Sequence, residues 1–324
     1  MQVVQRQKHS RVGNGPGYLA LEHSAFHLNL GKLSMPSSTQ LISAQTLHDM
    51  LTAGGVDVLV CDCRSDLVDL AAGARAFAQS HIPGARYVDL TTELSAPKTG
   101  TNGRHPLPVI AEFVAAMLDW GVNDQTVLVA YDSHGGLYGS RLWWLARAAG
   151  HTRVMVLDGG LPAWTAAGYT VTSEPPPARA RGNFKQKTSL VAAVDVVNVR
   201  AGLSNADRIL VDARPGDRFQ GQNETLDRLA GHIPGAVSRP VKENLRENGL
   251  FKDAGTLRAE FTRLLGQHKP YQLVASCGSG VSACHLLLAM ELAGLPGGAL
   301  YGGSWSEWSA QPDAPVETGP GRLN

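Results

Sequence analysis

The residues with the clearest chemical potential lie in one short loop, CGSGVS, at positions 277–282. An apolar run, QLVAS, precedes the loop and a helical pattern follows it directly, so the sequence predicts a strand, a tight loop and a helix. The two glycines let the backbone curl until several N–H groups point inward at a helix N-terminus, which favours negative charge. Such a setting stabilises a thiolate. Cys277 is therefore predicted to be a nucleophile rather than a buried cysteine beside a turn.

The same loop, together with two arginines, is predicted to bind a small anion. Arg214 and Arg218 directly follow the strand that opens the second half of the chain, and Arg228 lies in the loop that leads to His232. Loops at the carboxyl ends of parallel strands face the ligand crevice. A guanidinium there holds a carboxylate with two parallel hydrogen bonds. For Arg228 a solvated loop charge is the alternative. The predicted anion-binding residues are Gly278, Gly280, Val281, Ser282, Arg218 and Arg228.

An internal repeat divides the chain into two halves. Four motifs occur twice in the same order: VDVLVCDCR (56–64) with DRILVDAR (207–214), HIPGA (81–85) with HIPGA (232–236), TVLVAYDSHGG (126–136) with YQLVASCGSGV (271–281), and VLDGGLPAW (156–164) with ALYGGSWSEW (299–308). Duplication of one fold is the simplest explanation.

Each half alternates short strands rich in Val and Leu with longer helical stretches, which is typical of parallel α/β units. Right-handed crossovers place helices on both faces of each sheet. We therefore predict an α/β fold with two tandem domains, each a mainly parallel sheet. The predicted boundaries are a disordered extension at 1–35, with Met35 as the native start, a first domain at 36–172, a Pro-rich linker at 173–189, a second domain at 190–312 and a tail at 313–324.

Composition limits the partners and the compartment. The 29 Lys and Arg balance the 28 Asp and Glu, so no overall basic field indicates nucleic acid or an anionic membrane surface. Four cysteines are too few for a disulfide scaffold and lack zinc spacing, which predicts a reducing, cytoplasmic setting and no metal or cofactor. The first 34 residues lack the apolar core of a signal peptide and an apolar run of ~20 residues, so they are expected to be an extension, with a mitochondrial transit peptide as the alternative.

The motifs resemble those of the rhodanese family, specifically its tandem members, which include 3-mercaptopyruvate sulfurtransferases. The resemblance rests on CGSGVSAC at 277–284, the two HIPGA loops and GGSWSEW at 302–308. It implies two rhodanese-like domains and a sulfurtransferase that moves a sulfane sulfur from a small anionic donor onto Cys277 as a persulfide. It further implies cyanide, a thiol or a thioredoxin as the acceptor, and catalysis by the second domain alone.

The duplication identifies the inactive half independently. Alignment of LVAYDSHGG with LVASCGSGV places Asp132 where Cys277 stands, and a carboxylate cannot carry sulfur. The first half is thus expected to serve packing and to wall a cleft between the domains. We also expect SHGGLY to lack a turn that aims N–H groups inward.

The resemblance implies a proton relay as well. Asp62 and His81 of the first half, with Ser279 of the loop, match positions proposed to relay a proton in mercaptopyruvate enzymes. Such a relay is chemically reasonable, because loss of sulfur from mercaptopyruvate leaves a pyruvate enolate that must be protonated. For His232 we expect a turn fixed for backbone reasons, and for His81 the same turn is the alternative to the relay.

The choice of donor follows from charge. Arg218 matches the arginine that binds the donor anion in the family, and Arg228 matches a second, carboxylate-binding arginine. Rhodaneses that prefer thiosulfate usually carry Arg and Lys directly after the cysteine, whereas Gly278 and Ser279 are uncharged. The sequence therefore favours mercaptopyruvate as the donor, with thiosulfate second.

A phosphatase function is disfavoured by the residue at position 283. A phosphatase of related fold needs an arginine on the sixth residue after the cysteine, where this chain has Ala283. A thiosulfate-specific rhodanese and a non-catalytic module that carries sulfur or binds a partner remain alternatives. Cys284 falls in an apolar stripe, and Cys61 and Cys63 share one face of a predicted strand without further ligands, so core packing is expected for all three.

Overall fold

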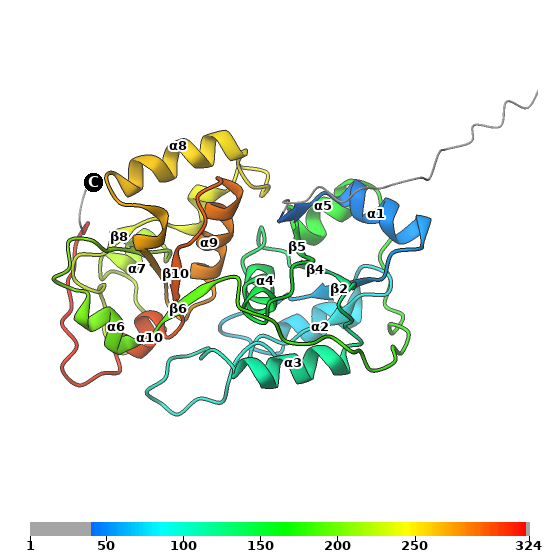
Figure 1. Ribbon diagram of the computed structural model, residues 1–324, viewed down its shortest axis with the longest axis horizontal. Helices are drawn as coiled ribbons and strands as arrows, with labels where there is room; N and C mark the ends of the chain where they lie inside the picture. Colours follow the sequence, from blue (N-terminus) through cyan, green and yellow to red (C-terminus); the bar gives the residue numbers. More distant parts are fainter. Residues whose placement is uncertain (1–39, 322–324) are drawn as a thin grey trace, which may run out of the picture. The chain divides into compact units, whose positions relative to one another are not determined.

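The computed structural model describes residues 40–321 and contains two five-stranded sheets with helices packed against them (Figure 1). The first sheet has the order β1-β5-β4-β2-β3 and the second the order β6-β10-β9-β7-β8, so the two halves share one topology. The strands are β1 (Leu41–Ile42), β2 (Val58–Asp62), β3 (Arg86–Tyr87), β4 (Val127–Tyr131), β5 (Val154–Leu157), β6 (Ala192–Val194), β7 (Ile209–Asp212), β8 (Val237–Ser238), β9 (Leu273–Ser276) and β10 (Ala299–Tyr301).

Every pairing within the two sheets is parallel, which confirms the predicted α/β fold class with two mainly parallel sheets. The helices are α1 (Ala44–Ala53), α2 (Ala72–Gln79), α3 (Ile110–Asp119), α4 (Gly139–Ala148), α5 (Gly160–Ala166), α6 (Val196–Ala201), α7 (Gly216–Phe219), α8 (Ala254–Leu265), α9 (Ser282–Leu292) and α10 (Ser304–Trp308), with 3₁₀ turns at Val241–Asn244 and Pro270–Gln272.

Side-chain alternation along the strands explains why both faces of each sheet are covered. In β2, Leu59 and Cys61 join one apolar cluster while Val60 joins another on the opposite face. All five residues of β4 are buried, as expected for a central parallel strand between two layers of helices. The strands of each half therefore end in loops at one edge, where functional side chains can gather.

The core is shared by the two halves. Helices α4 and α9 pack against each other, and residues of both belong to one continuous apolar cluster. Both helices are buried almost all round, which fits a helix enclosed between two sheets rather than one facing solvent. Each of them begins just after a central strand, so the two strand-to-helix loops lie near the interface between the halves.

Each half also extends a segment over the other. From the first half, residues 88–109 reach the second domain, where Arg104 donates its backbone N–H to Ser306 Oγ at 2.9 Å. From the second half, residues 239–253 reach the first domain, where Phe251 donates its backbone N–H to Asp158 Oδ1 at 2.9 Å. The exchange is reciprocal, and it places first-half residues beside the Cys277 loop.

Within residues 40–321, no helix combines the length and apolar character needed to cross a bilayer. The expected extension at 1–35, with its start at Met35, lies outside the described residues.

Candidate active site

The loop that follows β9 holds Cys277 at the N-terminus of α9, as the sequence predicts. The side chain is 1% exposed, and its sulfur accepts the backbone N–H of Gly280 at 3.1 Å. Gly280 has φ +78°, and a Cβ there would lie 2.2 Å from the carbonyl oxygen of Gly302, so only glycine fits. The tight turn thus points an N–H group at the sulfur.

The motif GGSWSEW at 302–308 supports this loop through hydrogen bonds. Ser304 Oγ accepts the Cys277 backbone N–H at 3.0 Å, although Ser304 must adopt φ +54° to do so. The N–H groups of Trp305 and Ser306 then donate to the carbonyls of Cys277 and Gly278, each at 2.9 Å. These three contacts fix the backbone on the side of the loop opposite the helix.

Arginines gather around Gly278. A Cβ built on this glycine would lie 3.0 Å from Arg104 Nη2, 3.7 Å from Arg218 Nη1 and 3.8 Å from Arg214 Cδ. Arg214 is buried, binds the carboxylate of Asp212 and forms an ion pair with Glu224 at 3.5 Å, so carboxylates of its own half hold it. The structure therefore brings Arg218 to the loop, together with Arg104, which the sequence did not single out.

Two carboxylates hold Arg218 in place. Its Nη2 lies 2.8 Å from Glu224 Oε1 and 3.1 Å from Asp227 Oδ2, and its side chain is 14% exposed. Arg228, only one residue after Asp227, is exposed, in agreement with the solvated alternative for that residue. Of Arg218 and Arg228, only Arg218 is positioned beside the cysteine loop, and Arg214, which follows the same strand, lies there as well.

Ser279 meets a histidine from the other half. Its hydroxyl lies 2.8 Å from His105 Nδ1, and both residues are buried. Burial lowers the pKa of His105 to about 3, and the nearby charges of Arg141 and Arg104 act in the same direction. His105 is therefore neutral near pH 7 and can hold the serine hydroxyl in one orientation.

The relay expected through Asp62 and His81 has to be corrected. Asp62 is occupied by Arg64 and by the Tyr131 hydroxyl, and both ring nitrogens of His81 lie near backbone carbonyls, those of Phe77 at 2.8 Å and Glu174 at 3.0 Å. None of these contacts involves Ser279.

The second half repeats the same arrangement. His232 Nδ1 lies 2.8 Å from the Phe219 carbonyl, and Arg214 pairs with Asp212 as Arg64 pairs with Asp62. A contact found in both the active and the inactive copy belongs to the fold, so the turn explanation accounts for both histidines. His105 takes the place at Ser279 that was assigned to His81.

Arg141 joins the two halves at this point. Its fully buried guanidinium donates to the carbonyls of Leu94 and Pro106, to that of His105 at 2.9 Å, and to that of Gly280 in the cysteine loop at 3.2 Å. One side chain thus fixes the distance between the segment that carries His105 and the loop that carries Cys277.

The corresponding loop of the first half is an anion hole filled by its own side chain. Asp132 Oδ1 accepts N–H groups from His134 at 2.7 Å and Gly136 at 3.0 Å, and Oδ2 accepts those of Tyr138 at 2.7 Å and Gly139 at 2.9 Å. The expectation that SHGGLY does not aim N–H groups inward is therefore wrong. Helix α4 begins seven residues after Asp132, whereas α9 begins five residues after Cys277, so the first half has a longer loop that holds a carboxylate in place of the sulfur.

The other three cysteines are thiols of the core. Burial raises the pKa of Cys61 and of Cys284 to about 12, and that of Cys63 well above its usual value. Their S–H groups face backbone carbonyls; that of Cys284 donates to Gly280 at 3.1 Å. Cys277 differs from them in accepting a backbone N–H on its sulfur.

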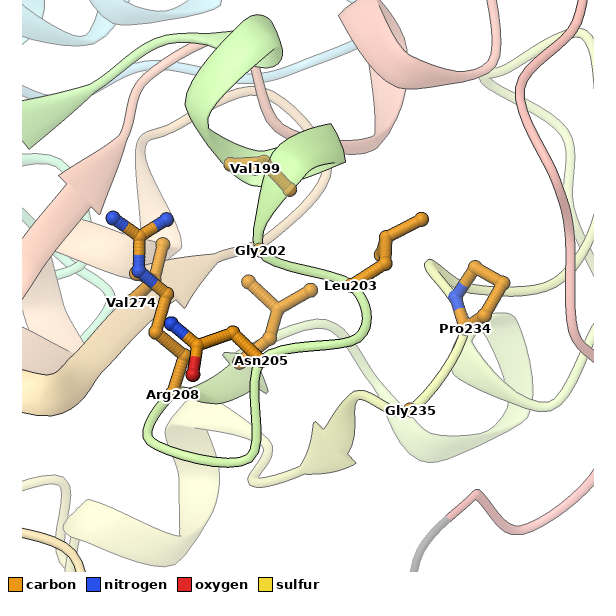
Figure 2. Close-up of a pocket in the computed structure, with 9 residues that line it drawn as sticks. Val199, Gly202, Leu203, Asn205, Arg208, Pro234, Gly235 and Val274 are labelled. Carbon is orange, nitrogen blue, oxygen red and sulfur yellow. The ribbon is translucent and has the colours of Figure 1, made fainter.

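A separate hollow lies on another part of the second domain (Figure 2). It is lined mainly by apolar residues and glycines around Val199, Leu203, Pro234 and Val274, and it has a volume of about 50 Å³. Its one ionisable residue, Arg208, donates to the carbonyl of Asn198. The hollow contains no nucleophile, so the Cys277 loop remains the candidate site.

The second domain holds a cysteine at the N-terminus of a helix, with arginines beside it and a hydrogen-bonded serine, an arrangement that suits nucleophilic chemistry on a small anion. The sequence matches the family described as Rhodanese-like domain twice, over residues 43–167 and 196–311. The chain belongs to this family and is a sulfurtransferase, an enzyme of the transferase class.

Relatives and solved structures agree with this assignment. The chain is 43% identical over 285 residues to a probable 3-mercaptopyruvate sulfurtransferase of Pseudomonas aeruginosa, covering 87% of this chain and 99% of that protein. It is 38% identical, over 86% of its length and 97% of the relative, to a putative thiosulfate sulfurtransferase of Mycobacterium tuberculosis. The structure of 3-mercaptopyruvate sulfurtransferase from Leishmania major aligns with TM-score 0.75 and 30% identity, over 85% of this chain and 75% of that one.

Proposed function

We propose that this enzyme carries sulfur as a persulfide on Cys277, taken from 3-mercaptopyruvate or thiosulfate and passed to cyanide, a thiol or a thioredoxin. The observation that carries the proposal is the Gly280 N–H on the Cys277 sulfur, in a loop at a helix N-terminus beside Arg218. The N–H group and the guanidinium favour negative charge at this position, which suits a negatively charged persulfide as the product.

The inactive half offers a template for that product. A carboxylate oxygen of Asp132 stands two atoms beyond Cβ, which is also the place of the outer sulfur of a cysteine persulfide. Asp132 receives four N–H groups there, two of them from the second and fourth residues after it. The residues at the same distance after Cys277 are Ser279 and Val281, and Val281 directly precedes α9. Their N–H groups are the proposed additional donors to the outer sulfur.

With thiosulfate, the Cys277 thiolate attacks the outer sulfur, the S–S bond breaks and sulfite leaves with the electron pair. With mercaptopyruvate, the thiolate attacks the thiol sulfur and the C–S bond breaks, so that its electron pair forms the pyruvate enolate. The proton of the donor thiol then moves to the enolate carbon. In the second step the acceptor attacks the outer sulfur and Cys277 leaves as the thiolate.

Ser279 and His105 fit the proton movement that only mercaptopyruvate requires. The Ser279 hydroxyl, oriented by neutral His105 at 2.8 Å, can receive the donor proton and pass it to the enolate. Sulfite needs no such proton to leave. We propose mercaptopyruvate as the first donor and thiosulfate as the second, and a reducing cytoplasmic setting, because all four cysteines are free.

The proposal is tested by mass spectrometry of the protein after incubation with each donor. We expect the Cys277 peptide to gain the mass of one sulfur atom, Cys277→Ser to gain none, and Cys284→Ser to behave as the parent. Lack of the added mass on the parent would instead favour a non-catalytic rhodanese module. His105→Asn should slow turnover of mercaptopyruvate about tenfold or more while turnover of thiosulfate changes little; equal losses with both donors would argue against the relay.

A further inference from the structure

We propose that Arg104, a residue of the catalytically inactive half, is a donor-binding residue of the Cys277 site and favours the dianionic donor thiosulfate. This inference rests on the proposed function, since it names which side chain holds the donor anion. It assigns the first half a direct role in substrate binding rather than packing alone.

The position of Arg104 is fixed by contacts with the second half. Its backbone N–H donates to Ser306 Oγ at 2.9 Å, in the same motif that supports the cysteine loop. Its Nη1 donates to the carbonyl of Leu226 at 3.2 Å and forms an ion pair with Asp227. The side chain is 19% exposed, so these contacts place a guanidinium in a site partly shielded from water.

The remaining nitrogens of this guanidinium have no partner. Both Nε and Nη2 of Arg104 are buried without a hydrogen bond, although buried donors are nearly always satisfied. Nη2 lies 3.0 Å from the Cβ position of Gly278, the residue that directly follows the nucleophile. A buried, unpartnered and charged donor beside the reactive cysteine indicates that an anion completes its hydrogen bonding.

Arg218 is paired differently. Its Nε and Nη2 bind the Glu224 carboxylate, and Nη2 also reaches Asp227. Of these two carboxylates, Arg104 pairs only with that of Asp227, through Nη1. Its Nε and Nη2 have no hydrogen-bond partner, and Nη2 faces the loop. Of the two guanidiniums beside Gly278, that of Arg104 therefore has the more complete set of donors available to a ligand.

The absence of a side chain at Gly278 now has a physical reason. Nη2 of Arg104 fills the space into which a side chain at position 278 would grow. The cation that an arginine directly after the cysteine would supply thus comes from the first half. The uncharged loop alone predicts a weak preference for dianionic donors, and Arg104 restores part of the missing charge.

The test compares kcat/KM for thiosulfate and for mercaptopyruvate, with cyanide as the acceptor, in the full-length parent, Arg104→Gln and Arg104→Lys. We expect Arg104→Gln to lower kcat/KM for thiosulfate by on the order of 10- to 100-fold, mainly through KM, and that for mercaptopyruvate by less. Arg104→Lys keeps the positive charge but loses the planar pair of donors. Its kcat/KM for thiosulfate should therefore lie between those of the parent and of Arg104→Gln. Arg75→Gln, which breaks an exposed ion pair of the first half, is the matched control.

A charge relocation provides an independent readout. Gly278→Arg alone should lower both specificity constants, because the new side chain meets Arg104. Arg104→Ala combined with Gly278→Arg should recover at least part of the thiosulfate rate lost in Arg104→Ala. A purely structural role for Arg104 predicts no such recovery, and its absence would overturn the proposal.

Binding without chemistry separates this inference from the proposed function. Calorimetric titration of thiosulfate into Cys277→Ser and into Cys277→Ser with Arg104→Gln should show a dissociation constant raised on the order of tenfold or more by loss of the arginine. A parent that turns over, with Arg104→Gln within twofold of Arg75→Gln for both donors, would overturn the role of Arg104 alone. A parent that binds thiosulfate through Arg104 but forms no persulfide would refute the proposed function and support Arg104 as an anion ligand.

Discussion

Replacing Asp132 with Asn should destabilise the protein strongly, although the two side chains have the same shape. The two oxygens of Asp132 each accept two backbone N–H groups, and all four donors are within the loop and the start of α4. An Asn side chain offers one oxygen and one NH₂ group. Whichever way it turns, two buried N–H groups must face an NH₂ group.

A buried donor left without an acceptor costs about 1–3 kcal/mol. Two of them amount to a loss of about 2–6 kcal/mol, and the loss of a negative charge at a helix N-terminus adds to it. We therefore expect the free energy of unfolding of Asp132→Asn to fall by about 4 kcal/mol. Urea titration followed by circular dichroism measures this directly.

Asp158→Asn is the matched control. Burial raises the pKa of Asp158, and the hydrogen bond that its side chain accepts from the Phe251 N–H can be kept by the oxygen of an amide. We expect this variant to lose less than about 1 kcal/mol. An Asp132→Asn protein that is as stable as Asp158→Asn would refute the anion-hole interpretation of the first half.

Three further predictions concern the contacts around the site. Ser304→Ala removes the acceptor of the Cys277 N–H and should cost about 1–3 kcal/mol in a urea titration, with slower persulfide formation by mass spectrometry. Arg141→Met removes a buried cation that joins the two halves and should cost about 3–5 kcal/mol; a loss below about 1 kcal/mol would contradict its bridging role. Burial lowers the pKa of His105 to about 3 and that of His285 to about 4. The unfolded chain therefore binds more protons than the folded chain between these pH values and 6.5. The free energy of unfolding should fall as the pH drops below 6.5. Each histidine should lower the free energy of unfolding by about 2 kcal/mol between pH 7 and pH 5. His285→Phe should show a correspondingly weaker pH dependence of stability. An unchanged pH dependence would argue against this role of His285.

Local patterns were sufficient to predict the cysteine loop. The order of strand, glycine turn and helix is written in consecutive residues around Cys277, and the duplicated motifs identify the repeated sheet. Arg218 could be predicted too, because it follows a strand whose carboxyl end must face the same edge as the cysteine.

His105 and Arg104 could not be placed in this way. They lie in a long segment without strand or helix periodicity, and His105 contacts Ser279 across 174 positions of sequence. The tripeptide RHP in that segment was the available signal, but its partner is defined only when the two halves pack. The sequence already argued against a role for His81 in the relay, because His232 occupies the same position of the repeated motif in the other half.

The reciprocal exchange of segments makes the single chain equivalent to a tethered heterodimer. The first copy, which has Asp132 in place of the cysteine, contributes Arg104 and His105 to the surroundings of the Cys277 loop. The second domain expressed by itself would keep Cys277 and its glycine turn but lose both of these neighbours. Deletion of either copy would therefore remove residues that surround the Cys277 loop.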